Sequence, residues 1–298
     1  MIIDRLIDKI KEKKNPTVLG LDTCAEYMPD ELRVGIKSFK DAGKAVFEFN
    51  KNIIDNTADI IPAVKVQAAY YEMYGSYGAE AFQKTLEYAK KQGLVTIADV
   101  KRNDIASTAG AYSKAYLSHS DISGEAAFDS DFITVNPYLG SDGIIPFTDD
   151  CSKYGKGIFV LVKTSNKSSS EIQNRVLDDG TKIYELMSDY AAEWGKGLTG
   201  KYGYSSVGAV VGATQTAEAE AIRKRHKGLF FLLPGYGAQG ATAKDLAVSF
   251  DADGLGAIVN NSRGIICAYK KYDGLNYYRA ARKAAELMKD DLNAYLPL

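Results

Sequence analysis

Two aspartates and one lysine stand close together in residues 99–104, whose sequence is DVKRND. They follow the apolar run 94–98, which is typical of a buried strand. Because side chains alternate along a strand, Asp99 and Lys101 are expected to point the same way, and Asp104 follows where a helix is expected to begin. A lysine between two carboxylates has a strongly altered proton affinity, as proton-transferring groups do. Taken alone, the same pattern is also typical of a solvated salt-bridge cluster.

The bulk composition is that of an ordinary globular protein. The chain has 298 residues, of which 46% are hydrophobic and 25% charged, enough for one large α/β domain or two small ones. No linker interrupts it, so we expect a single domain over residues 1–298. A net charge of −1 predicts no broad basic face and hence no nucleic-acid partner. The three cysteines form no C-x-x-C pair, and no apolar run approaches the roughly 18 residues that span a bilayer, so we expect a cytoplasmic protein without membrane contact.

Short apolar runs alternate with helical patterns from end to end. The predicted strands are 17–21, 60–66, 94–100, 132–135, 157–162, 207–211, 229–233 and 256–259, and helical candidates include 39–56, 80–92, 104–118, 181–196, 216–226 and 276–294. Eight strand–helix units predict a (β/α)8 TIM barrel, with a doubly wound open sheet as the alternative. An additional N-terminal helix over residues 2–13 carries apolar positions 3, 6, 7 and 10 and is expected to pack across the barrel bottom. The polar, serine-rich segment 166–180 is the candidate for a mobile loop.

Polar side chains lie at the ends of nearly all the predicted strands. In chain order they are Asp22, Lys65 with Gln67, Asp99 with Lys101, Asn136, residues 163–166 (KTSN), residues 234–240 (PGYGAQG) and residues 260–264 (NNSRG). In a (β/α)8 barrel the carboxyl ends of the strands surround one mouth, where the active site is built. The joint pattern therefore predicts a polar ligand at that mouth.

Three glycines after the seventh predicted strand suggest where a phosphate binds. Gly235, Gly237 and Gly240 spell G-x-G-x-x-G, which elsewhere marks a dinucleotide-binding fold. Here the motif comes too late in the chain for such a fold, whereas barrels bind phosphate with the loops after strands seven and eight. Arg263 in the next loop is suited to clamp a phosphate, with Gln239 adding a hydrogen bond. The alternative for Arg263 is a surface salt bridge.

These motifs together resemble the orotidine 5′-phosphate decarboxylase family, and its longer bacterial branch most of all. The matching strings run in family order over nearly the whole chain: GLD at 20–22, VK at 64–65, DVKRNDI at 99–105, TVNPYLG at 134–140, KTSN at 163–166, VGAT at 211–214, LPGYGAQG at 233–240 and NSRG at 261–264. One departure is visible, because Lys167 and Ser168 stand where a Pro-Gly pair is expected. That departure puts the stiffness of the fifth loop in doubt.

The resemblance implies a role for each matching residue. It makes Lys101 the proton donor and places Asp99 beside the departing carboxylate, with Asp104 completing the catalytic set. It implies a homodimer in which Asp104, Ile105 and Thr108 reach into the partner's site. The remaining substrate-binding residues are Asp22 and Lys65 at the ribose hydroxyls, Ser165 at the pyrimidine, and Pro234, Gly235, Gln239, Arg263 and Gly264 around the phosphate.

The implied reaction converts orotidine 5′-phosphate to UMP in de novo pyrimidine synthesis, with no metal and no organic cofactor. Three alternatives stay open. A relative acting on a sugar phosphate as a decarboxylase or aldolase carries a similar Asp-x-Lys-x-x-Asp motif but uses Mg²⁺. A Schiff-base aldolase would act through Lys101 or Lys163, although flanking carboxylates keep an amine protonated. A barrel that binds nucleotides without catalysis is the alternative of a different class.

Overall fold

Eight parallel strands close into a barrel in the computed structural model, which describes residues 1–119, 122–237 and 240–298. The strands are β1 Thr17–Leu21, β2 Ala63–Gln67, β3 Val95–Arg102, β4 Phe132–Val135, β5 Gly157–Lys163, β6 Val207–Val211, β7 Phe231–Pro234 and β8 Ala257–Asn261. Closure comes from β1, which pairs with β2 on one side and with β8 on the other. The predicted barrel is confirmed, and the open-sheet alternative is wrong.

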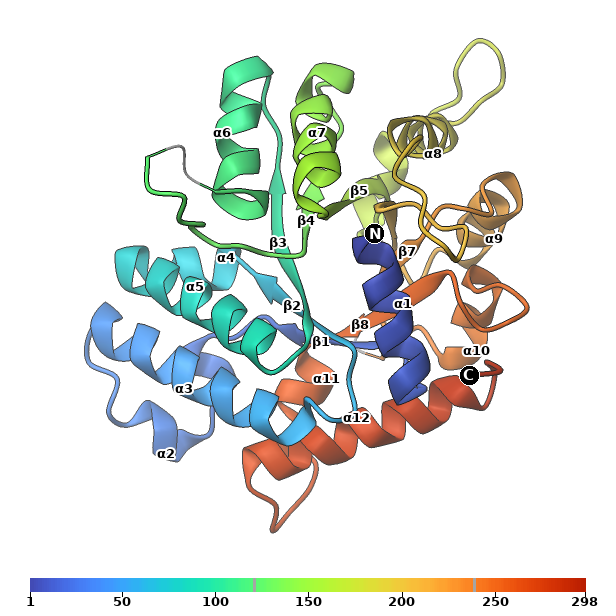
Figure 1. Cartoon of the computed structure of the whole chain (residues 1–298). Helices are drawn as coiled ribbons and strands as arrows, with labels where there is room; N and C mark the ends of the chain where they lie inside the picture. Colours follow the sequence, from blue (N-terminus) through green and yellow to red (C-terminus); the bar gives the residue numbers. More distant parts are fainter. Residues whose placement is uncertain (120–121, 238–239) are drawn as a thin grey trace.

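Helices surround the strands (Figure 1). They are α1 Ile2–Lys13, α2 Asp30–Arg33, α3 Phe39–Thr57, α4 Ala69–Glu72, α5 Gly75–Lys91, α6 Ala106–Leu117, α7 Ile145–Tyr154, α8 Ile183–Trp194, α9 Thr216–Arg225, α10 Ala243–Leu246, α11 Arg263–Ile266 and α12 Tyr277–Asn293. The outer faces of the strands and the inner faces of these helices share one large apolar cluster. None of the helices in the described ranges is long and apolar enough to cross a bilayer.

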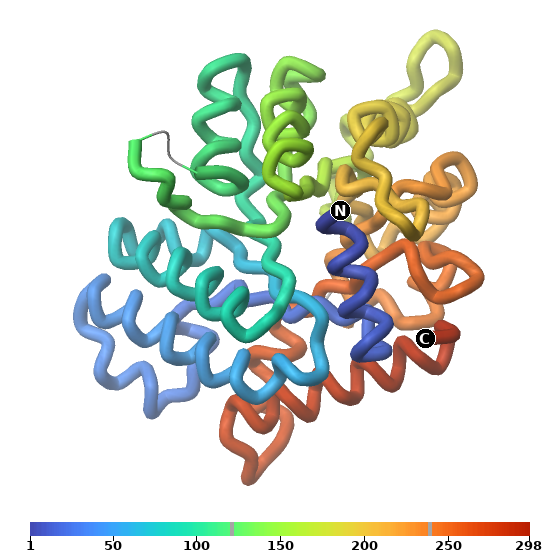
Figure 2. Tube along the Cα trace, viewed as in Figure 1, coloured from blue at the N-terminus to red at the C-terminus, as the bar shows by residue number. Residues whose placement is uncertain are grey.

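The N-terminal helix closes one end of the barrel (Figure 2). Its residues Ile3, Leu6, Ile7 and Ile10 are fully or almost fully buried. They belong to a second apolar cluster with inward-facing strand residues, among them Ala63, Val95, Phe132, Phe159 and Phe230. The expectation that this helix packs across the barrel bottom is confirmed, and it leaves the opposite end of the barrel for ligands.

Five strands, β2, β3, β5, β7 and β8, differ in their bounds from the prediction, and for two of them, β2 and β3, the structure shows the reason. β2 begins at Ala63 rather than at residue 60, because Ile60 and Ile61 still donate their backbone N–H groups to Thr57 at the end of α3. β3 continues to Arg102 instead of ending at residue 100, and α6 consequently begins at Ala106. This extension carries Lys101 within the strand.

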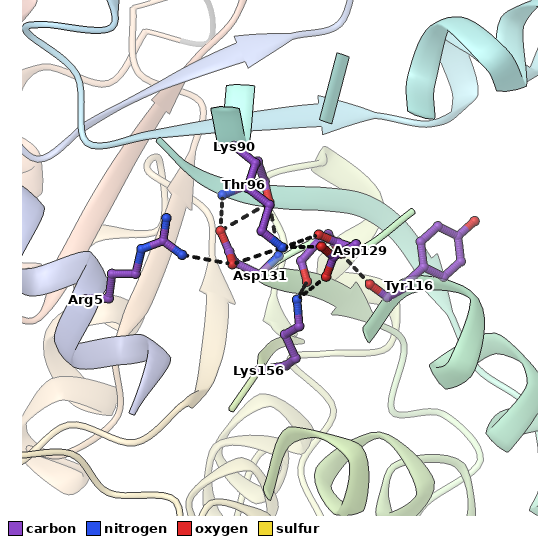
Figure 3. A network of polar contacts seen from close by, with 8 residues as sticks. Arg5, Lys90, Thr96, Tyr116, Asp129, Asp131 and Lys156 are labelled. Carbon is purple, nitrogen blue, oxygen red and sulfur yellow. Dashed lines mark hydrogen bonds and ion pairs between the residues drawn. The ribbon is translucent and has the colours of Figure 1, made fainter. Parts of the chain in front are cut away.

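A polar network ties together the strand ends next to α1 (Figure 3). Asp131, just before β4, accepts hydrogen bonds from the backbone and side chain of Thr96 and an ion pair from Arg5. The Asp129 carboxylate forms ion pairs with Lys90 Nζ at 2.5 Å and with Lys156 Nζ at 2.6 Å. Because these groups lie at the amino ends of the strands, away from the predicted mouth, we assign this network to stability.

Candidate active site

The carboxyl ends of the strands surround a cavity of about 340 Å³. Among the residues predicted from the sequence, those that line it are Asp22, Lys65, Asp99, Lys101, Ser165, Pro234, Gly235 and Arg263. They come from six different strands or the loops that follow them. The barrel thus gathers residues that are up to 241 positions apart in the chain (263 − 22) around one space.

Charges of alternating sign run across the floor of this cavity. Lys65 Nζ lies 3.3 Å from Asp22 Oδ1 and 2.9 Å from Asp99 Oδ2. Asp99 Oδ1 in turn accepts from Lys101 Nζ at 2.6 Å. The order is therefore Asp22, Lys65, Asp99, Lys101, and each inner member has an opposite charge on both sides.

Burial and charge act against each other on the two inner members. Burial alone would lower the pKa of Lys65, but Asp22 and Asp99 outweigh it and raise that pKa above its usual range. Burial would likewise raise the pKa of Asp99, but Lys65 and Lys101 hold it well below the ordinary value of an aspartate. Both groups are therefore ionised across the physiological range. Lys101 differs from them because 44% of its side chain is exposed, so its ammonium group is the member of the row most open to a ligand.

Thr134 of β4 was given no role on sequence grounds, yet it joins this row. Its Oγ1 donates to Asp99 Oδ1 at 2.8 Å and accepts the backbone N–H groups of Val100 and Lys101 at 3.0 and 2.9 Å. Lys101 has a left-handed backbone, with φ of 47°. The only sign of Thr134 in the sequence was a hydroxyl residue inside a short apolar strand, and hydrophobic periodicity assigns no role to such a residue.

The sequence pattern predicted that Lys101 lies between Asp99 and Asp104, and within a single chain this is wrong. Lys101 pairs with Asp99, and in the described part of the molecule it forms no ion pair with Asp104, whose Oδ1 accepts from the Ile105 backbone N–H at 2.8 Å. The lysine that lies between two carboxylates is Lys65. Lys101 and Ala106, on either side of Asp104, have positive φ angles of 47° and 44°, so the chain between them does not continue the regular path of the strand. Asp104, Ile105 and Thr108 consequently lie outside the cavity lining.

The predicted phosphate end is built from the loops after β7 and β8. Pro234, Gly235 and Arg263 line the cavity, and Gly235 has a φ of 115° that favours glycine. Among the described residues no carboxylate lies within ion-pair distance of the Arg263 guanidinium, so the salt-bridge alternative finds no partner there. Gly264 lies in a neighbouring hollow that it shares with Arg263. Gln239 lies outside the described residues.

Several further polar residues face the same space, and all of them except Tyr70 belong to the strand-end pattern that predicted a ligand at this mouth, although none was given an individual role. Gln67, Tyr70, Thr164, Tyr236, Asn260, Asn261 and Ser262 all contribute to the lining. Most of them stand beside a predicted residue at a strand end, so position alone was a usable signal. Within the described ranges no three His, Cys, Asp or Glu side chains are arranged to hold a metal ion.

The fifth loop is tied to its strand despite lacking the Pro-Gly pair. Gln173 accepts from the backbone N–H of Thr164 at 2.9 Å and donates to its Oγ1 at 2.8 Å. Lys163, buried beside the cavity, donates to Ser169 Oγ at 3.1 Å, and burial lowers the pKa of its amine. These bonds hold the stretch that carries Ser165, although mobility of residues 166–180 stays a prediction.

Comparisons with known proteins agree with this geometry. Residues 19–273 match the model of the orotidine 5′-phosphate decarboxylase / HUMPS family. Orotidine 5′-phosphate decarboxylase of Clostridium acetobutylicum is 44% identical over 298 residues, which cover 99% of this chain and 100% of that protein. The enzyme of the same name from Caldicellulosiruptor saccharolyticus is 44% identical and is covered over 97% of its length by 98% of this chain.

A solved structure extends the agreement to three dimensions. The Leishmania donovani OMP decarboxylase structure superposes with a TM-score of 0.76 at 30% identity, covering 99% of this chain and 98% of that one. The resemblance drawn from the motifs is thereby confirmed. The chain belongs to the orotidine 5′-phosphate decarboxylase family.

Proposed function

We propose that this chain decarboxylates orotidine 5′-phosphate to UMP, a step of de novo pyrimidine synthesis, without a cofactor. The observation that carries the proposal is the ammonium group of Lys101, half-exposed at the cavity and held at 2.6 Å by a buried carboxylate. Relatives with 44% identity over nearly their whole length bear the name of this enzyme. The reaction needs a fixed cation at the carbon that loses CO2, and Lys101 meets that need.

Lys101 has two tasks in this proposal. As the bond between C6 of the pyrimidine and the carboxyl carbon breaks, CO2 leaves and the electron pair stays on C6. The ammonium stabilises that developing negative charge and then transfers a proton from Nζ to C6, which forms the C–H bond of UMP. The neutral amine regains its proton from water. Asp99 holds the Lys101 ammonium in place beforehand through the contact at 2.6 Å.

The rest of the cavity supplies binding energy that aligns C6 with Lys101. We assign Asp22 and Lys65 to the ribose hydroxyls, since this pair lies beside Asp99. We assign Ser165 to the pyrimidine. Arg263, with Gly264 and the Pro234–Gly235 wall, takes the phosphate, and Gln239 is assigned to the same group from the resemblance. Contacts with a remote phosphate raise the rate when they improve alignment at the reacting carbon.

We also propose that the enzyme is a homodimer with shared sites. Asp104, Ile105 and Thr108 follow β3 but do not line their own cavity, as expected if they complete a partner's site. Apolar side chains near the same mouth are exposed, with Ile105 at 55%, Tyr138 at 85% and Leu139 at 48%. Large exposed apolar groups of this kind are typical of interfaces. The three cysteines are free thiols, which suits a reducing compartment such as the cytoplasm.

The Mg²⁺-dependent alternative fits this site less well. A divalent cation at Asp99 would lie beside two ammonium groups, those of Lys65 and Lys101, and their charges would repel it. The deciding assay adds purified protein to orotidine 5′-phosphate and follows the ultraviolet change as UMP forms, with and without EDTA. We expect equal turnover in both. Loss of activity with EDTA would favour the alternative, and UMP binding without turnover would favour a non-catalytic barrel.

A further inference from the structure

We propose that Thr134 is a positioning residue for the decarboxylation, setting the geometry of Asp99 and Lys101 through a single hydroxyl group. The inference rests on the proposed function, because it assigns the reaction to these two side chains. Thr134 itself is 1% exposed and stands in the middle of β4. All three of its hydroxyl contacts are to residues 99–101 of β3.

The backbone of β3 needs such a group because its pairing with β4 is interrupted. Ala98 pairs with Ile133 and Arg102 pairs with Val135, so β3 advances four residues while β4 advances two. The extra residues bulge out of the ladder, and Lys101 takes a φ of 47°. The N–H groups of Val100 and Lys101 then bond the Thr134 hydroxyl in place of a strand carbonyl. A buried N–H without such a partner is costly.

The hydroxyl is fully used by these contacts. A threonine hydroxyl has one donor and two acceptor positions, and here the donor meets Asp99 Oδ1 while both acceptor positions meet N–H groups. No capacity remains for a substrate, so Thr134 acts through its neighbours. It fixes Asp99 Oδ1, the same oxygen that receives Lys101 Nζ, and it fixes the backbone from which Lys101 extends. The Thr134 hydroxyl therefore fixes the position of the Asp99 carboxylate and of the Lys101 backbone at the same time.

The test compares two substitutions of Thr134 with a matched control elsewhere. Thr134→Val keeps the shape and removes the hydroxyl, whereas Thr134→Ser keeps the hydroxyl. The control is Thr57→Val, because the Thr57 hydroxyl is also buried but donates only to the Ile53 carbonyl inside α3. For each protein, kcat and KM for orotidine 5′-phosphate, the Kd for UMP and the unfolding midpoint in urea are measured.

We expect Thr134→Val to lower kcat by about 10- to 100-fold, since a misplacement of about 1 Å can cost that much. The Kd for UMP should stay within about threefold, because the phosphate and ribose contacts remain. Thr134→Ser should restore kcat to within about threefold, and Thr57→Val should leave kcat unchanged while lowering stability. If Thr134→Val does not fold, Thr134→Cys, whose sulfur is a weak acceptor, should show a smaller loss of kcat in the same direction.

Three results would overturn the inference. A kcat within twofold of wild type in Thr134→Val, or in Thr134→Cys if that variant is the one that folds, denies any positioning role. A parallel fall of kcat and UMP affinity indicates a general structural role, and so does failure of Thr134→Ser to restore activity. The proposed function fails separately, because that failure appears as a wild-type protein that does not convert orotidine 5′-phosphate.

Discussion

Replacing Lys101 with alanine should separate the chemistry of this site from the stability of its fold. The Lys101 side chain is 44% exposed, so its ion pair with Asp99 is screened by water and contributes about 1 kcal/mol or less to stability. Asp99 keeps Lys65 and Thr134 as partners after the substitution. The free energy of unfolding should therefore fall by about 1 kcal/mol at most, or roughly 1–2 °C in Tm for a chain of this length.

The effect on catalysis should be far larger. A positioned general acid contributes about 10²- to 10⁴-fold, and electrostatic stabilisation of a developing charge about 10²- to 10³-fold more. Lys101 supplies both in the proposed mechanism, so we expect kcat to fall by at least about 10⁴-fold, which corresponds to about 5.5 kcal/mol of activation free energy. Binding of UMP should persist, because the predicted ribose and phosphate contacts lie elsewhere.

Lys65→Ala is the matched contrast, since Lys65 belongs to the same row of charges but is only 4% exposed. Its loss leaves Asp22 and Asp99 without the cation between them, and breaking a buried pair costs about 3–5 kcal/mol. The ultraviolet assay gives kcat, titration calorimetry gives the Kd of UMP, and urea unfolding gives stability. Activity of Lys101→Ala within tenfold of wild type would refute its role. A loss of more than about 3 kcal/mol of stability in Lys101→Ala would refute the argument from exposure.

Three further outcomes follow from the same structure. Arg263→Ala should lower kcat/KM by a factor that corresponds to several kcal/mol of lost transition-state stabilisation, on the order of a charge-assisted phosphate contact, and by much less for a substrate without phosphate. Equal losses on both substrates would contradict the assignment. Asp129→Asn should cost about 1–2 kcal/mol in urea unfolding at pH 7, because Lys156 is buried and Asp129 is partly screened. Burial raises the pKa of Asp129, but its hydrogen bonds and charge interactions with Lys156 and Lys90 outweigh burial and lower that pKa below its ordinary value. The stability that Asp129 contributes is therefore present above about pH 4 and should vanish as the pH falls through its pKa in the folded protein. A stability difference between Asp129→Asn and wild type that does not change with pH would be inconsistent with this. Mixing inactive Lys101→Ala with inactive Asp104→Ala should restore about a quarter of wild-type activity if Asp104 acts across a dimer, because each mixed dimer then holds one complete site; no recovery after subunit exchange would exclude shared sites.

The main elements of the barrel were predictable because their signals are local. Short apolar runs mark strands buried on both faces, and the apolar stripe of residues 2–13 marks a helix with one buried face. The expectation that Asp99 and Lys101 lie together is confirmed, although the strand bulges there and Thr134 of β4 holds both residues. Boundaries were predicted less accurately, as at β3, where the strand continues through its bulge to Arg102.

The arrangement of charges in the site depended on contacts between distant segments. Sequence spacing suggested that Lys101 lies between Asp99 and Asp104, but closure of the barrel puts Lys65 between Asp22 and Asp99 instead. Spacing along the chain says nothing about which neighbouring strand faces a given side chain.

The amino-acid order by itself determined the strands, most of the helices and the set of polar residues at the strand ends, because each of these follows from interactions within a few residues. Only the tertiary structure decided the partners of those residues. The pairing of β3 with β4 placed the Thr134 hydroxyl against Asp99, since strand pairing joins segments that are not adjacent in sequence.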